Sequence, residues 1–195
     1  MAEFIDLSAY RAARGVFPPT RVIEPNEEAP LLAAIRQRSE LYFDLSVFLL
    51  DTGARIGEAA ALGWPAIAKQ SVTFAESKSA LGRTIPLTTR ATAVLLRQRR
   101  EIGGPFLLAR LSDYRDAWKQ AKRKAGINDA TLVPMSLRHT CAVRLVRGGI
   151  DLQTVQTWLG LRSLAMTMRY ARYADMNVLE ACVQALERPK SSPGS

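Results

Sequence analysis

The stretch that decides the fold runs from residue 136 to residue 173 and reads SLRHTCAVRLVRGGIDLQTVQTWLGLRSLAMTMRYARY. It divides into three helical patterns separated by short turns, namely residues 136–146, 152–159 and 164–172. The first pattern carries Arg138 and the last carries Tyr170. A guanidinium can bind a phosphate and a phenol can attack one, so these residue types suit phosphodiester chemistry without a metal.

A second stretch, DTGARIGEAAALGW over residues 51–64, supplies another arginine. Arg55 follows Gly53, which lets the chain turn sharply into a helix. An arginine at a helix start forks N–H donors onto a phosphate, and the helix dipole adds to its field. Together with Arg138 it would stabilise the extra charge of a pentacoordinate transition state. Glu58 is expected to orient this helix or an arginine, or else to be an ordinary surface acid.

The rest of the chain reads as further helices around one pair of strands. The additional helical patterns cover residues 27–38, 40–50, 55–62, 88–101, 112–125 and 175–187. Val72 and Phe74 alternate with polar residues, so residues 71–87 are expected to form a hairpin with its turn at 79–82. The predicted fold class is mostly α with one small antiparallel β-hairpin.

The domain organisation follows from composition. Residues 1–25 are interrupted by prolines and are expected to form an arm or a linker. Residues 26–187 have the size of one domain with its own core. The tail over residues 188–195 is too polar to fold alone and is expected to be disordered. Ser112 is expected to cap the following helix, and residues 105–108 to form a short strand or an irregular buried piece.

The charge balance points to a polyanionic partner. The chain has 27 basic and 18 acidic residues, a net charge of +9. Nucleic acid is the first candidate, an anionic membrane surface the second, and a basic protein with no such partner the remaining one. No apolar run approaches the ~20 residues of a membrane span. One histidine and two cysteines, Cys141 and Cys182, are too few for a zinc site, so no metal or cofactor is expected and the cysteines are expected to stay reduced in a cytosol.

These motifs together resemble the catalytic domain of the tyrosine recombinases, the lambda-integrase-like phage integrases. The matching words are TGxRxxE at residues 52–58, SKSALGRTIPL at 77–87, LRHT at 137–140, and a tyrosine ten residues after Gly160. They occur in the family's order, and the resemblance covers about residues 21–186. It implies the tyrosine recombinase catalytic-domain fold and an enzyme that cuts and rejoins DNA through a covalent 3′-phosphotyrosyl intermediate.

The resemblance also implies roles for single residues. Arg55 and Arg138 would bind the scissile phosphate, and Lys78 would protonate the leaving 5′-oxygen. Tyr170 would be the nucleophile, with Tyr173 as the runner-up, and His139 would have a supporting role. Read without the family, Lys78 is an exposed lysine at a strand edge. Either tyrosine is then a half-buried aromatic with its hydroxyl at the surface.

The chain departs from the family at two positions. Met135 stands where a histidine usually precedes the second arginine, and Leu161 stands where a histidine or tryptophan usually follows the LG turn. Neither side chain can accept the tyrosine proton or bind a phosphate oxygen. This favours an alternative function, a catalytically impaired DNA-binding protein that keeps the recombinase fold. A type IB topoisomerase with the same chemistry is a third interpretation.

Several cations are expected to contact the DNA backbone. They are Arg83 in the hairpin and Arg115, Lys119, Lys122 and Arg123 in the 112–125 helix. The alternative for each is a solvated helix face. The resemblance further implies double-stranded DNA as the partner, a homo-oligomer (a tetramer) on that DNA, no membrane contact, and a cytoplasmic protein of bacterial or phage origin. The apolar face of the 175–187 helix would dock on a neighbouring protomer or fold back on its own core.

Overall fold

A computed structural model of the chain describes residues 20–78, 80–98 and 103–174. Its elements are α2 (Pro25–Arg38), α3 (Glu40–Thr52), α4 (Ile56–Ala60), η1 (Trp64–Ala66), β1 (Ser71–Phe74), β2 (Arg83–Pro86), α5 (Thr89–Leu96), α6 (Leu111–Lys124), α7 (Met135–Arg147), α8 (Leu152–Leu159), α9 (Leu164–Thr167) and η2 (Met168–Tyr173). The two strands are antiparallel. The predicted fold class is therefore confirmed. The expected helix over 175–187, the tail over 188–195 and most of the N-terminal arm lie outside the described residues.

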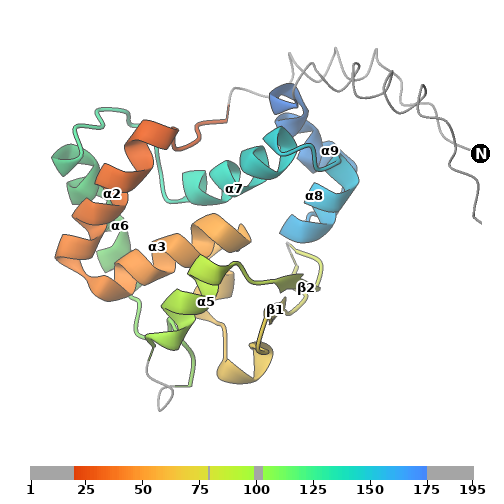
Figure 1. Ribbon diagram of the computed structural model, residues 1–195, viewed down its shortest axis with the longest axis horizontal. Coiled ribbons are helices and arrows are strands. Elements are labelled where there is room, and N and C mark those ends of the chain that lie inside the picture. The colour runs from red at the N-terminus through yellow and green to blue at the C-terminus, as the bar shows by residue number, and fades with distance from the viewer. Residues whose placement is uncertain (1–19, 79, 99–102, 175–195) are drawn as a thin grey trace, which may run out of the picture.

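Helix α3 forms the centre of the domain. Its sequence ELYFDLSVFLLDT is apolar on nearly every face, which is typical of a helix surrounded by others. It packs against α2, α5 and α7, and Phe48, Leu45 and Leu49 are fully enclosed. Figure 1 shows α3 and α7 across the middle, with α2 and α6 at one end and α8 and α9 at the other. Helix α3 ends near the centre of the domain. The TGAR turn at its end, residues 52–55, therefore lies close to α7 and α8.

A second, smaller core joins the three helical segments of the 136–173 stretch. Val143 from α7, Val155 and Leu159 from α8, and Tyr170 from η2 pack together. The predicted bounds of α8 agree with the structure, because Asp151 caps its start and Gly160, with φ +63°, ends it. The predicted 164–172 helix is instead a short α-helix that continues as a 3₁₀ segment.

Other predicted boundaries need correction. Helix α6 begins at Leu111 with Arg110 at the cap position, and the hydroxyl of Ser112 donates to Asp113 instead of capping. Helix α5 is shorter than predicted and is capped by Thr88. Of the two alternatives for residues 105–108, the strand is wrong, and the segment is irregular with its first two residues buried.

The hairpin loop is also longer than predicted, since it spans residues 75–82 between the two strands. Thr73 and Thr84 face each other across the pair, and Phe74 pairs with Arg83. The local bridge between Ser77 and Ala80 closes the tip of this loop. The loop therefore extends well beyond the strands, which matters because it carries Lys78.

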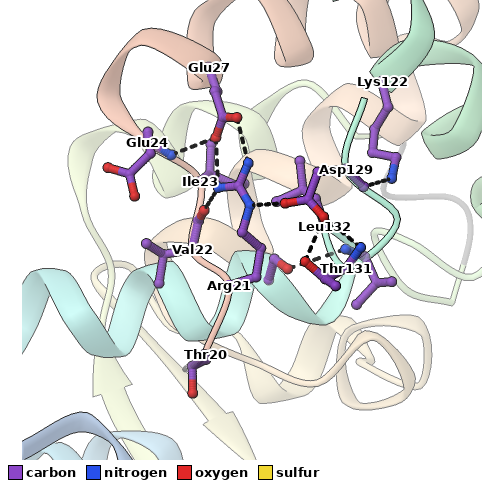
Figure 2. A network of polar contacts seen from close by, with 12 residues as sticks. Thr20, Arg21, Val22, Ile23, Glu24, Glu27, Lys122, Asp129, Thr131 and Leu132 are labelled. Atoms are coloured by element: carbon purple, nitrogen blue, oxygen red, sulfur yellow. Dashed lines mark hydrogen bonds and ion pairs between the residues drawn. The ribbon is translucent and has the colours of Figure 1, made fainter. Parts of the chain in front are cut away.

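The N-terminal segment over residues 20–24 is held against the body of the domain by a polar network (Figure 2). Arg21 Nε donates to Asp129 at 2.6 Å, and its other nitrogens donate to Glu27. Asp129 also accepts from the backbone and hydroxyl of Thr131. The backbone N–H of Ile23 donates to the hydroxyl of Thr140 in α7. These contacts fasten the entry of the chain to the loop between α6 and α7.

We expect Asp129→Asn to lower the Tm by a few degrees at pH 7. The hydrogen bonds from Thr131, and then Arg21, hold the pKa of Asp129 well below its usual range. A depressed carboxyl pKa contributes stability above the unfolded value of about 4 and loses it as the pH falls below that value. The Tm difference between variant and wild type should therefore shrink between pH 7 and pH 3, as measured by thermal denaturation.

The matched control is Asp116→Asn, which removes an exposed carboxylate whose ion pair with Lys119 has a 3.5 Å separation. Exposed pairs of this kind contribute little, so its Tm should stay near the wild-type value at every pH. An equal loss for the two variants would contradict the role given to Asp129.

Candidate active site

Arg55 is placed by the turn that links α3 to α4. Gly53 has φ +65°, a backbone conformation that favours glycine, and a Cβ there would lie 2.6 Å from Leu159 Cδ2. Arg55 then occupies the N-cap of α4, as the sequence predicted. Its backbone N–H donates to Glu58 Oε2 at 2.7 Å and its Nη1 donates to Glu58 Oε1 at 3.1 Å. The side chain is 22% exposed, so Glu58 orients a guanidinium that is still partly accessible to solvent.

Arg138 lies in α7 and is buried at 4% exposure. Its Nη1 donates to the carbonyl of Gly53 at 2.6 Å and its Nη2 to the carbonyl of Leu159 at 2.8 Å. One guanidinium thus links the turn after α3 with the end of α8. Burial, followed by the charge of Arg55, lowers the pKa of Arg138 to about 10, so Arg138 stays protonated at neutral pH.

Glu58 is the carboxylate that the arginines share. Arg83 donates to both of its oxygens, at 3.1 and 3.0 Å, and Arg138 Nη1 lies 4.0 Å away. Burial acts to raise the pKa of Glu58, but the hydrogen bonds from Arg83 and from the Arg55 backbone outweigh it and lower this pKa. Glu58 is therefore ionised. The structure favours the prediction that it orients an arginine over the alternative of an ordinary surface acid.

Arg83 does not take the place predicted for it. Its side chain is 3% exposed, its guanidinium lies 4.4 Å above the ring of Phe74, and its Nε donates to the carbonyl of Trp158 at 2.8 Å. With its donors committed to Glu58 and Trp158 inside the protein, Arg83 does not fit a direct contact with the DNA backbone. The structure corrects this prediction, and Arg83 instead supports Glu58 from beneath.

Lys78 lies exposed in the loop between β1 and β2. The loop is fixed on either side of it: Arg162 donates to the carbonyl of Ser77 at 2.7 Å, and the Leu81 N–H donates to the carbonyl of Gly160 at 3.1 Å. A Cβ on Gly160 would lie 2.7 Å from the Leu81 carbonyl oxygen, so the approach is tight. The hairpin loop therefore packs on the turn at Gly160. The carbonyl of the preceding residue, Leu159, accepts from Arg138, so Lys78 lies on the same side of the site as the end of α8.

Tyr170 and Tyr173 face different surroundings. The hydroxyl of Tyr170 lies 2.8 Å from Nδ1 of His139, and the residue is 3% exposed. Burial raises the pKa of Tyr170, while the charges of Arg138, Arg169 and Arg55 act to lower it. The phenol therefore shares one electrostatic environment with both predicted phosphate-binding arginines.

Tyr173 instead donates its hydroxyl to the carbonyl of Thr20 at 2.8 Å, and Arg147 lies over its ring. It faces the N-terminal segment and not the arginine cluster around Glu58. This placement favours Tyr170 over Tyr173 as the nucleophile.

The two departures from the family supply no polar group. Met135 is the first residue of α7 and is 44% exposed, and Leu161 packs into the smaller core at 6%. Trp158 lies three residues before Leu161, but its indole N–H donates to the carbonyl of Thr52 at 3.0 Å and so does not replace the missing polar group. His139 is the imidazole that the structure brings to Tyr170. The sequence placed it one residue after Arg138 but gave no sign that it would meet a tyrosine 31 residues further on.

The basic side chains of α6 lie along its outer face. Arg115, Lys119 and Arg123 are exposed, while the ammonium of Lys122 donates to the carbonyl of Asp129. A hollow of about 290 Å³ lies between this face and the segment leading into α7, and Trp118 is part of its lining. Three of the predicted cations, Arg115, Lys119 and Lys122, thus lie beside the chain segment that leads into α7, the helix that carries Arg138.

Among residues 20–78, 80–98 and 103–174, no group of three or more His, Cys, Asp and Glu side chains gathers in a way that would hold a metal ion. Within the same residues, no helix is both long and apolar enough to cross a membrane. Cys141 is buried, and Cys182 lies outside the described residues.

A mostly helical domain that gathers arginines from two helices around a tyrosine defines the class of tyrosine recombinase catalytic domains. Residues 21–177 match the Phage integrase family, and the chain belongs to that family. The integrase of Escherichia phage P2 is 31% identical over 157 residues, which cover 80% of this chain and 44% of that protein. The chain therefore spans less than half the length of this relative.

Solved structures agree with this assignment. The catalytic domain of bacteriophage HP1 integrase superposes with a TM-score of 0.70 at 28% identity, covering 89% of this chain and 98% of that one. The Tn1549 transposon integrase in complex with circular intermediate DNA has a TM-score of 0.68 at 19% identity, covering 88% of this chain and 68% of that one. The second likeness shows the fold alone.

Proposed function

We propose that this chain is the catalytic part of a site-specific DNA recombinase that cuts and rejoins double-stranded DNA through a covalent 3′-phosphotyrosyl intermediate. The observation that carries the proposal is the convergence of Arg55, Arg138 and Tyr170. The two arginines share Glu58, and the hydroxyl of Tyr170 lies 2.8 Å from Nδ1 of His139, the residue that follows Arg138 in α7. Membership of the phage integrase family and the basic charge of +9 support the same function.

In the proposed reaction Arg55 and Arg138 contribute to phosphate binding in different ways. Arg55 is partly exposed and would bind a phosphate oxygen while Glu58 keeps its side chain in place. Arg138 adds a positive charge that does not move, because two backbone carbonyls hold it. Such preorganised charge stabilises the pentacoordinate transition state more than the ground state.

The covalent step exchanges one phosphodiester for another. Tyr170 Oη bonds to phosphorus, the bond to the 5′-oxygen breaks, and the leaving oxygen takes a proton from Lys78. The energy of the broken bond is kept in the phosphotyrosyl link. A 5′-hydroxyl can therefore attack it in the reverse direction and reseal the strand.

The same proposal includes the organisation of the protein. Residues 26–187 would form the catalytic domain, residues 1–25 an arm or linker, and residues 188–195 a disordered tail. The exposed cations of α6 would lie against the DNA backbone, which makes binding weaken as salt rises. We further propose assembly as a homo-oligomer, a tetramer, on double-stranded DNA in the cytoplasm of a bacterium.

The test is capture of the covalent intermediate by the full chain. A pool of nicked duplexes with a randomised core releases a short strand after cleavage, so any phosphotyrosyl adduct accumulates. Adducts are separated on a denaturing gel, the bound DNA is sequenced, and the modified peptide is identified by mass spectrometry. We expect a sequence-selected adduct on Tyr170. Binding without any adduct would overturn the proposal, and relaxation of supercoiled plasmid with no sequence selection would replace it with a topoisomerase.

A further inference from the structure

We propose that His139 is a catalytic residue of this site, accepting the phenol proton of Tyr170 as the phosphotyrosyl bond forms. The inference rests on the proposed function and assigns a proton acceptor where positions 135 and 161 offer none. The family resemblance implied only a supporting role for His139, which follows Arg138, and the inference gives it a role in proton transfer.

The contact that carries the inference joins two helical segments. His139 comes from the first turns of α7, and Tyr170 comes from η2, which packs against α7. Nδ1 of the imidazole lies 2.8 Å from the phenol oxygen, within the range for proton transfer. The rings are tilted by 50° with centroids 5.9 Å apart, so they meet at their polar edges and do not stack.

The surroundings keep the imidazole neutral, but they also oppose its protonated form, so the transfer depends on the negative phosphate that would be bound beside it. The charges that act on it are those of Arg169 in η2 and Arg138 in α7, and no carboxylate of the described residues is among them. Burial, with the two arginines, lowers the pKa of His139 to about 4. The ring is therefore neutral at pH 7. If Nδ1 accepts from the phenol, the proton of the neutral ring resides on Nε2.

Other groups near the phenol do not offer this chemistry. The Cys141 thiol is close enough to affect Tyr170, but burial raises the pKa of Cys141 to about 12 and its Sγ donates to the carbonyl of Asp51. Met135 and Leu161 have no polar hydrogen-bonding group. Arg138 and Arg169 are cations and can only donate.

Each proton that moves during cleavage has its own donor and acceptor. As Tyr170 Oη bonds to phosphorus, its proton passes to His139 Nδ1 and the imidazole becomes a cation. The proton on the leaving 5′-oxygen comes separately from Lys78. During resealing the attacking 5′-hydroxyl gives its proton back to Lys78, and the imidazolium returns its proton to the departing phenolate. The two proton transfers use different groups on different elements, so each can be removed alone.

The first experiment measures single-turnover adduct formation on the nicked duplex selected above. The variants are His139→Gln, whose amide oxygen accepts a hydrogen bond but takes up no proton, and His139→Ala. We expect both to react ~10²–10⁴-fold more slowly, the usual contribution of a general base. Duplex affinity should stay within about twofold, and added imidazole should partly restore His139→Ala because the ring is only half-buried.

A matched control separates the two proton transfers. A 5′-bridging phosphorothiolate has a leaving group that needs no protonation, so it should restore cleavage by Lys78→Ala but not by His139→Gln. Wild-type speed for His139→Gln, or rescue of that variant by the phosphorothiolate, would overturn the inference. If wild-type protein bound the duplex without forming an adduct, the proposed function would fail instead.

The second experiment does not depend on activity or on the folding of a His139 variant. His139 is the only histidine of the chain, so an untagged protein gives one set of imidazole nitrogen resonances. We expect the neutral Nε2–H tautomer at pH 7, with a shift of the Nδ1 resonance in Tyr170→Phe. A proton on Nδ1 would make the phenol the acceptor and overturn the inference.

Discussion

Replacing Tyr170 with phenylalanine is expected to abolish the covalent DNA adduct while leaving the fold and duplex affinity intact. Phenylalanine keeps the ring that packs in the smaller core and removes only the oxygen. The lost hydrogen bond to His139 is expected to cost about 0.5–1.5 kcal/mol of stability. Without the oxygen there is no nucleophile, so the denaturing gel should show no adduct at any time point.

The control for this variant is Tyr173→Phe. Its hydroxyl donates to the carbonyl of Thr20, away from the arginines, so adduct formation should persist. A small fall in Tm is expected, because the N-terminal segment loses one of its anchors. An adduct in Tyr170→Phe together with its loss in Tyr173→Phe would reverse the assignment of the nucleophile.

Local signals in the sequence were sufficient to predict α8 and the start of α4. The cap at Asp151 and the glycine at Gly160 gave the bounds of α8, because both ends depend on residues within one turn. The glycine before Arg55 predicted a helix start for the same reason. The prediction that Arg55 and Arg138 lie close together depended on the family resemblance, because no local signal in the sequence indicates it.

Partners that are distant in sequence could not be predicted. Arg83 and Glu58 are 25 residues apart, and from sequence alone both are charged residues typical of a surface. Their burial follows from how the hairpin docks on the end of α8, which depends on the packing of the whole domain. The hairpin turn was placed too narrowly for a related reason, because the tip of its loop is held by Gly160 and Arg162 and not by turn residues alone.

Replacing Glu58 has the largest expected effect on stability. Three guanidiniums surround its carboxylate, and the side chains of Arg83 and Arg138 are 3% and 5% exposed. Removing one partner of a buried ion pair typically costs about 3–5 kcal/mol, because the remaining charge is left uncompensated. We expect Glu58→Ala to lose stability in this range and to cleave DNA more slowly, since Arg55 also loses its anchor. Urea denaturation and the adduct assay measure the two effects.

The pH dependence of this contribution has a defined sign. The pKa of Glu58 is lowered in the folded protein, so its ionised form stabilises the fold above the unfolded value of about 4.3. That stability is lost as the pH falls below this value towards the folded pKa. The difference between wild type and Glu58→Ala should therefore be largest at neutral pH and decrease under acid conditions.

A double-mutant cycle with Arg83→Met tests whether the loss comes from the uncompensated charge. Methionine fills part of the buried volume over Phe74 without a charge, so the double variant should be more stable than the sum of the two single losses predicts. The control is Glu40→Gln, which breaks the exposed pair with Arg36 and should cost about 0–1 kcal/mol. If Glu58→Ala cost no more than Glu40→Gln, or if the cycle were additive, Glu58 would not be the carboxylate that holds the arginines together.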